Sequence, residues 1–380
     1  MVELDLSSAL SSNDAKFENA GTFQKKLPFF REKDRHPVKV DDLVVDFRLK
    51  RDILSRSTLG VFYTGRQAEE GDYNRVVGID QNLIFLQHLS LNAMFGRSFT
   101  DGVSENELMG SFTLGWLDDL LDTRFNYVYL DENFQSDLGF IERPGTRKLD
   151  SRFAISPRPN SDIIRQFNFS YHLEDFKVVA TGELQSRIHH FGFNTFFQNG
   201  SSVRIGPHRP TENLTEPLRL PGGLIVPPGR YSWWYVPFNY SLNPARMVSG
   251  NFSYRYEKDY YGEGGRRHQW QINPVFKLSS RFSADMAYSI NKIGLFEGEL
   301  VTFHQVNSSI NVAFSRKWLT STTIQYNSDR DVIGINFRLN YIYRPGDDLF
   351  VVYNDSRNRT NSPAEMDRSF VIKLTHSFDF

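Results

Sequence analysis

The 380-residue chain contains no cysteine, so disulfides, thiolate metal sites and a cysteine nucleophile are excluded. It also lacks any apolar run of about 18 residues, which excludes a transmembrane helix. Membrane-spanning strands stay possible, because they need only about 9–11 residues and keep every second position polar. The net charge is -1, from 44 basic and 45 acidic residues without a basic block. Nucleic-acid binding therefore has no electrostatic support.

The amino-terminal stretch "MVELDLSSALSSND" has no positively charged start, apolar core or small-residue cleavage site. As written, the chain is therefore expected to carry no export signal. We expect either a trimmed mature form or a fragment of a longer precursor.

Aliphatic residues are scarce and aromatic residues are plentiful. Hydrophobic residues make up 39% of the chain, yet aromatics reach 14%, with 33 Phe, 17 Tyr and 5 Trp. Soluble globular chains have about 45–50% apolar residues. The composition is typical of a sheet whose aromatic side chains lie at an interface between an apolar phase and water, rather than of a buried core.

Segments of roughly ten residues with period-two alternation recur from about residue 40 onward. In "VIGINFRLNYIYR" (332–344), Ile, Phe, Leu and Tyr occupy one face, while Gly, Asn and Arg occupy the other. "NFSYRYEKDYY" (251–261) repeats the pattern. Charged and amide side chains are costly in lipid but suit a polar lumen. The predicted lumen-lining residues are Arg255, Asn336, Arg338 and Asn340.

Connections between these segments alternate in length. Short ones include "WLDDLLD", "SPRPNSD", "LNPARM", "KLSSRF", "FSRKWL" and "RPGDDL". Longer polar ones lie near residues 67–72, 99–105, 134–147, 203–230, 257–265 and 356–367. This asymmetry predicts a closed antiparallel transmembrane β-barrel with short periplasmic turns and long extracellular loops. We expect about 18–20 strands over residues 40–380, and an irregular segment with room for one strand over residues 1–39.

Aromatic residues gather where strands meet turns, which is typical of the interfacial girdles of a barrel. They are Trp116, Trp233, Trp234, Tyr235, Trp318, Tyr341 and Tyr343. Aromatic packing in a soluble sandwich or propeller is the alternative, although no blade repeat is visible.

The longest connection contains "HRPTENLTEPLRLPGGLIVPPGRYSWWYVPF" (208–238). Its prolines predict an irregular first part, because proline removes a ladder donor. Long loops often act as plugs, lids or receptor surfaces, and we predict a constriction or lid; an interdomain linker is the alternative. The residues assigned to this lid are Pro227, Pro228, Gly229, Tyr231, Trp233 and Trp234.

No motif predicts catalysis, a metal site or a cofactor. His189 and His190 are neighbours on a strand and should point to opposite faces, so they cannot easily chelate one ion. Neither H-E-x-x-H nor G-x-S-x-G occurs, and no acidic string matches a calcium loop. Serine and histidine are available for a hydrolase at the barrel wall, for example His304 and His376, but no spacing selects a pair.

The chain ends in the alternating stretch "RSFVIKLTHSFDF", with Phe378 and Phe380 on its apolar side. Such an ending predicts a terminal strand that is paired within a sheet. By resemblance, a terminal Phe with alternating aromatics is similar to the signal that the outer-membrane barrel-assembly machinery reads. His376 stands where such signals usually have an apolar residue.

Three stretches resemble the carboxy-terminal barrel domain of a Gram-negative outer-membrane protein family of unknown function. They are "LVVDFRLKRDILSRSTLGVFYTGRQAEEGDYNRVVGIDQNLIF" (43–85), "VPPGRYSW" (226–233) and "STTIQYNSDRDVIGINFRLNYIYRPGDDLFVVYND" (321–355), and "LPFFREKD" (27–34) adds a weaker match. Full-length members carry a signal peptide and a domain similar to family-nine carbohydrate-binding modules, neither of which this chain shows. The resemblance covers roughly residues 28–380; it implies fold and outer-membrane location and carries no catalytic residues.

Together these features predict a non-enzymatic outer-membrane protein that serves as a pore, an uptake component or a surface scaffold. Its expected partners are the lipid bilayer, the assembly machinery, and surface or periplasmic proteins, without nucleic acid. Two alternatives stay open: a barrel-embedded hydrolase acting on lipid, peptide or glycan, and an inactive fragment of a longer protein.

Overall fold

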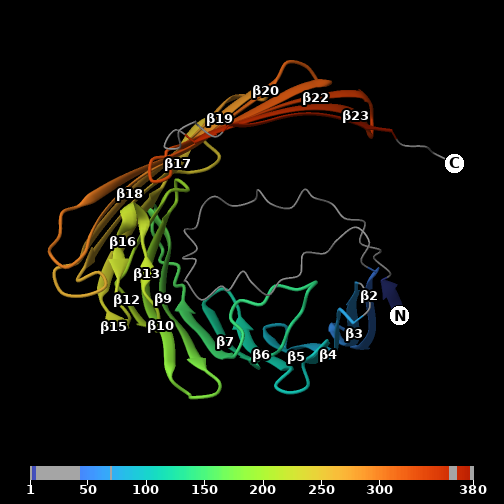
Figure 1. Ribbon diagram of the computed structural model, residues 1–380. Coiled ribbons are helices and arrows are strands. Elements are labelled where there is room, and N and C mark those ends of the chain that lie inside the picture. The colour runs from blue at the N-terminus through green and yellow to red at the C-terminus, as the bar shows by residue number, and fades with distance from the viewer. Residues whose placement is uncertain (1, 6–42, 69–70, 359–365, 377–380) are drawn as a thin grey trace.

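The computed structural model describes residues 2–5, 43–68, 71–358 and 366–376. Figure 1 shows a single large sheet that curves into a broad arc. The first half contains β1 (Val2–Asp5), β2 (Leu43–Leu54), β3 (Ser57–Gln67), β4 (Tyr73–Phe85), β5 (Leu89–Thr100), β6 (Leu108–Leu117), β7 (Leu121–Leu130), β8 (Thr146–Ile155), β9 (Ile164–Val178), β10 (Leu184–Phe197), β11 (Ser202–Ile205) and β12 (His208–Leu214). The second half contains β15 (Gly229–Ser232), β16 (Trp234–Ser241), β17 (Val248–Lys258), β18 (Arg266–Ser279), β19 (Phe282–Gly294), β20 (Val301–Ala313), β21 (Trp318–Asn327), β22 (Val332–Arg344), β23 (Asp347–Asn358) and β24 (Met366–Thr375).

All ladders are antiparallel, and outside β10 to β16 they join strands that follow one another along the chain. Within the described residues the sheet has 22 strands. β11 and β12 both pair with β10 on one side and with β16 on the other, so together they occupy one interrupted strand position. β15 and β16 both pair with β12 and likewise share one interrupted position. The 22 strands therefore occupy 20 positions; β1 takes one of them, and the other 19 agree with the 18–20 strands predicted for residues 40–380.

The antiparallel all-β class is confirmed, whereas closure stays a prediction. In the described part of the chain, β1 pairs with β2, β24 pairs with β23, and no ladder joins β24 to β1 or β2. Figure 1 shows the arc open between its first and last strands. The same residues include no helix long and apolar enough to cross a membrane.

The two edges of the sheet carry connections of different length, as predicted. All six short connections lie on one edge, which we call the short edge; its longest connection is 156–163, between β8 and β9. The opposite, long edge carries 101–107, 131–145, 215–228, 259–265 and 295–300. Residues 359–365, part of one predicted long loop, are outside the described residues.

Cross-strand register gives the sheet one apolar face and one polar face. Partners opposite each other in an antiparallel ladder point to the same side. Starting from Ile335 of β22, successive ladders connect Ile324 of β21, Ser308 of β20, Met286 of β19 and onward to β2. The apolar face so traced exposes Val45, Val61, Ile79, Phe95, Phe112, Phe125, Phe153, Phe169, Phe193, Val236, Phe252, Ile272, Met286, Ile310, Ile324 and Phe337. The alternate positions form the polar face.

The polar face is on the concave side of the arc. On this face Arg66 pairs through Nε with Asp137 of the β7–β8 connection at 2.7 Å, and Asn74 receives the backbone N–H of Asp137 at 3.0 Å. Figure 1 shows this connection inside the arc, over β5 to β7. Side chains of the 131–145 connection thus cover part of the concave surface.

Aromatic residues on the apolar face gather near the short edge. Trp318 stacks on Tyr341 with ring centroids 4.3 Å apart, and Trp116 packs against His88 at 5.5 Å. Several charged residues of this face lie instead near the long edge, at Arg75, Arg97, Arg147, Lys258 and Arg266. The resulting apolar band with an aromatic border is the arrangement expected of a membrane-facing surface.

Two predictions about the longest connection are wrong. Residues 203–205 and 208–214 are strands rather than irregular chain, so the connection shrinks to 215–228. Pro210 is tolerated in β12 because it faces Trp233, at the break between β15 and β16, where no N–H is required of it. Its carbonyl still accepts the Trp233 N–H at 3.3 Å.

Candidate functional site

A row of polar and aromatic side chains crosses the polar face from β8 to β16. His172 Nε2 contacts Asp150 Oδ1 at 3.1 Å, and the His172 ring stacks on His190 with centroids 5.0 Å apart. Nδ1 of His190 and Nδ1 of His208 are 2.5 Å apart, and His208 stacks on Tyr235 at 4.7 Å. The register explains the row, because His172 pairs with His190, His190 with His208, and His208 with Tyr235.

The row continues into a buried charge cluster on β17 and β18. The Arg255 guanidinium lies over the Tyr235 ring at 4.9 Å and approaches Glu257 at 3.6 Å. Glu257 is almost fully buried, and it accepts hydrogen bonds from Trp233 Nε1 at 2.6 Å and Arg267 Nη1 at 3.2 Å. A carboxylate buried at this depth requires such donors, since an unpaired charge would be costly.

The connection 215–228 folds onto the polar face beside this cluster; we call it the folded-in connection. It contains β13 (Leu218–Arg219), the short 3-10 turn η2 (Pro221–Gly223) and β14 (Ile225–Val226). Leu218 and Val226 are buried in a hydrophobic cluster with Ile293 and Phe303 of β19 and β20. The backbone N–H of Gly222 donates to Asp329 Oδ1 at 2.8 Å, in the β21–β22 turn.

A second buried carboxylate lies at the base of the folded-in connection. Tyr261, in the 259–265 connection, donates its hydroxyl to Glu212 Oε2 at 2.5 Å, and both side chains are buried. Desolvation and then the charge of Glu212 raise the pKa of Tyr261 above its ordinary value, so the phenol stays protonated and acts as donor. Buried, hydrogen-bonded carboxylates therefore hold side chains of the polar face in place at the long edge.

The predicted lid residues separate into two groups. Pro227 and Pro228 end the folded-in connection, and Tyr231 of β15 donates its hydroxyl to the Pro227 carbonyl at 2.9 Å. Trp233 is buried on the polar face, whereas Trp234 is exposed on the apolar face beside Arg209. Gly229 begins β15. Trp233 and Tyr235 therefore do not belong to an interfacial girdle, because alternate residues of a strand point to opposite faces.

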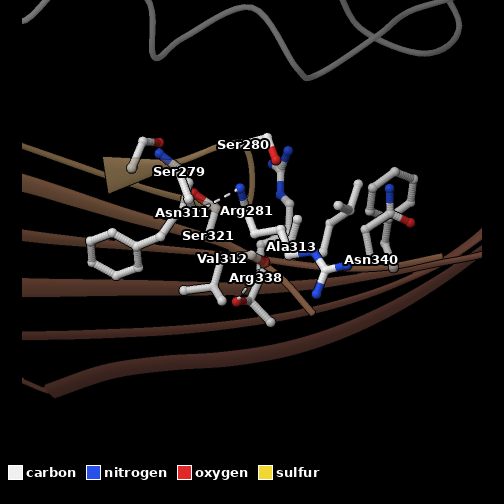
Figure 2. A pocket seen from close by; sticks show the side chains of 14 residues that line it. Ser279, Ser280, Arg281, Asn311, Val312, Ala313, Ser321, Arg338 and Asn340 are labelled. Carbon is white, nitrogen blue, oxygen red and sulfur yellow. Dashed lines mark hydrogen bonds between the residues drawn. The ribbon is translucent and has the colours of Figure 1, made fainter. Parts of the chain in front are cut away.

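The predicted lumen-lining residues all lie on the polar face, at two separate places. Arg255 belongs to the charge cluster, and Asn336 donates to Asn354 Oδ1 at 2.5 Å on β23. Arg338 and Asn340 line a pocket of about 370 Å³ near the short edge, between β18 and β23. Figure 2 shows their side chains beside those of Asn311 and Ser321.

Groups for catalysis or metal binding do not converge in the described residues. His189 and His190 point to opposite faces, as predicted: His189 contacts the Tyr171 hydroxyl at 2.8 Å, and His190 contacts His208. No serine hydroxyl bonds to a histidine ring in this part of the chain, and no three His, Asp or Glu side chains are placed to hold a metal ion. Phe378 and Phe380 are outside the described residues.

Sequence reasoning missed the buried acids Glu212 and Glu257 and the histidine row. One signal was available, because Glu257 shares the alternation of Arg255 on the predicted lumen face. The row itself depends on the register of five strands, and no local pattern specifies it.

No family model and no curated protein matches this chain. The chain is similar to the solved structure of the copper transporter OprC, with 10% identity, a TM-score of 0.46, and coverage of 83% of this chain and 66% of that one. It is also similar to the open form of the ferric-catecholate import receptor Fiu from E. coli K12, with 9% identity, a TM-score of 0.45, and coverage of 84% of this chain and 73% of that one. The chain thus spans just under two thirds of the length of OprC.

Proposed function

We propose that the chain forms an outer-membrane β-barrel of a Gram-negative bacterium that lets polar solutes pass, as a pore or an uptake component. One observation carries the proposal: a single apolar face extends across the sheet, and its large hydrophobic side chains are exposed. Soluble monomers rarely expose contiguous apolar patches beyond a few hundred Å². Lipid is the environment that such a face fits.

Closure completes the proposal. An open sheet edge in hydrocarbon leaves ladder N–H and C=O groups unpaired, and each costs several kcal/mol. Pairing of β24 with the first strands would remove both edges. The terminal Phe378 and Phe380 then serve as the recognition signal for the barrel-assembly machinery, consistent with the resemblance to an outer-membrane barrel family.

The folded-in connection acts in this proposal as a constriction. It leaves the sheet between β12 and β15, packs on the polar face over β19 and β20, and reaches the β21–β22 turn. A segment that crosses several strands on the lumen side narrows the path for solutes. Its contacts are apolar over Ile293 and Phe303 and polar at its tip.

Planar-bilayer recording of the purified chain tests the proposal. We expect discrete ion conductance that disappears when the protein is heat-unfolded before insertion. Deleting residues 217–226 should increase the single-channel conductance. A chain that inserts into vesicles but conducts neither with nor without this segment would contradict the pore and leave a surface scaffold, which pull-down of partner proteins from outer membranes would reveal.

A further inference from the structure

The pocket at the short edge has a chemistry that differs from the rest of the polar face. Its lining includes Arg281, Asn311, Ser321, Arg338 and Asn340, and it contains no aspartate or glutamate. Most arginines elsewhere on this face meet a carboxylate, as Arg48 meets Asp80, Arg124 meets Asp150 and Arg267 meets Glu257. Within the described residues, neither Arg281 nor Arg338 has a carboxylate at ion-pair distance.

Register builds the pocket from two adjacent cross-strand rows. In the first row Ser283 pairs with Asn311, Asn311 with Ser321, and Ser321 with Arg338. The second row runs from Ala313 through Leu319 and Asn340 to Phe350. Strands hold these side chains, and Arg281 joins them from the two-residue β18–β19 turn (Figure 2). A site on strands is more rigid than one on long loops.

One acceptor in the pocket has no partner. The Oδ1 atom of Asn340 is buried and makes no hydrogen bond within the described residues. Leaving a buried polar atom unsatisfied costs about 1–3 kcal/mol. A ligand hydroxyl placed against Asn340 would satisfy it.

We propose that this pocket binds a small phosphate ester with a hydroxylated body, of the size of a sugar phosphate. Two guanidinium groups without a carboxylate at ion-pair distance line the pocket, and arginine is well suited to bind phosphate oxygens. Asn311, Ser321 and Asn340 supply hydrogen-bonding groups for hydroxyls. Phe350 supplies an apolar wall, and a volume of about 370 Å³ is in the range of small-ligand pockets.

The proposal depends on the polar face being accessible to solutes, as the proposed function requires, but not on transport. Titration calorimetry on the full chain in detergent micelles uses glucose 6-phosphate, inorganic phosphate and glucose as probes. We expect glucose 6-phosphate to bind most tightly, phosphate more weakly, and glucose not measurably. Raising the NaCl concentration should weaken binding of both anions.

Variants separate the two parts of the pocket. Arg338→Gln and Arg281→Gln should each lower the affinity for both anions about tenfold, as expected for loss of a charged hydrogen bond. Asn340→Leu should weaken glucose 6-phosphate about fivefold and leave phosphate unchanged. Arg316→Gln, in the β20–β21 turn outside the pocket, is the matched control and should change neither. Heat-modifiable gel migration verifies that each variant is folded.

Several results would overturn the site. The first is a loss of affinity in Arg316→Gln equal to that in the pocket variants. The second is binding of phosphate as tight as that of glucose 6-phosphate. The third is measurable glucose binding that none of the four substitutions changes. Conductance is a separate readout: a conducting chain that binds no phosphate ester contradicts this pocket alone, whereas phosphate-ester binding by a non-conducting chain contradicts the pore alone.

Discussion

The backbone N–H of Gly222 donates a 2.8 Å hydrogen bond to Oδ1 of Asp329, a residue 107 positions later in the chain. This bond joins the tip of the folded-in connection to the β21–β22 turn. The connection is also held by apolar contacts around Val226 and, at its end, by the Tyr231 hydroxyl bond to the Pro227 carbonyl. The bond therefore anchors the polar tip of the folded-in connection, which crosses the concave face.

Asp329→Ala should release the tip of the folded-in connection from the β21–β22 turn more often. Loss of an exposed hydrogen bond of about 1 kcal/mol shifts the released population roughly fivefold. Limited trypsin digestion should then cleave faster after Arg219, and mean conductance should rise. Asp119→Ala, which removes an exposed acid in a short-edge turn, is the control; an equal gain in cleavage there would contradict the assignment.

Gly222→Ala should displace the folded-in connection more than Gly223→Ala. Both glycines have φ of +74°, so both alanines carry the same left-handed strain. An added Cβ at Gly222 would lie 2.7 Å from Cζ of Phe303, whereas at Gly223 it meets nothing within 4 Å. Trypsin cleavage of the two variants under native conditions measures the difference. Equal rates would show that the connection does not pack on Phe303.

Ile272→Arg should impair insertion, whereas Gln271→Arg should not. Ile272 is exposed on the apolar face of β18 and Gln271 is its neighbour on the polar face. Arginine facing lipid near the bilayer midplane costs about 2–4 kcal/mol in barrels. Folding into lipid vesicles, followed by heat-modifiable gel migration, gives the yields. Similar yields for the two variants would contradict the assignment of faces.

Asp118 should make the β6–β7 turn sensitive to acid. The Leu121 N–H at 2.7 Å, followed by Trp116 Nε1 at 2.7 Å and the Leu120 N–H, lowers the pKa of Asp118 below its ordinary 3.8. Because the folded-state pKa is depressed, the stabilisation is present above pH 3.8 and is lost as pH falls through the folded pKa.

Thermal unfolding in detergent between pH 6 and pH 2 measures this effect. The parent chain should lose more stability below about pH 4 than Asp118→Asn, which keeps an acceptor but no ionisable group. Parallel curves for the two proteins would assign the acid loss to other carboxylates.

The alternating pattern and the lengths of the connections predicted the antiparallel sheet, the strand number and the difference between its edges. It also placed Arg255, Asn336, Arg338 and Asn340 on one face. These features are local, because the residues of each segment by themselves determine its period-two alternation and its turns. Proline was misleading at Pro210, because the break beside Trp233 removes the need for its missing N–H.

The contacts between distant strands were decided only by the tertiary structure. The histidine row depends on the registers of β8 to β16, and a shift of one residue in any ladder would send its histidine to the apolar face. The burial of Trp233 and the folding-in of residues 215–228 depend on apolar partners at Ile293 and Phe303, far along the chain. Sequence thus determined which residues share a face, and packing determined which of them meet.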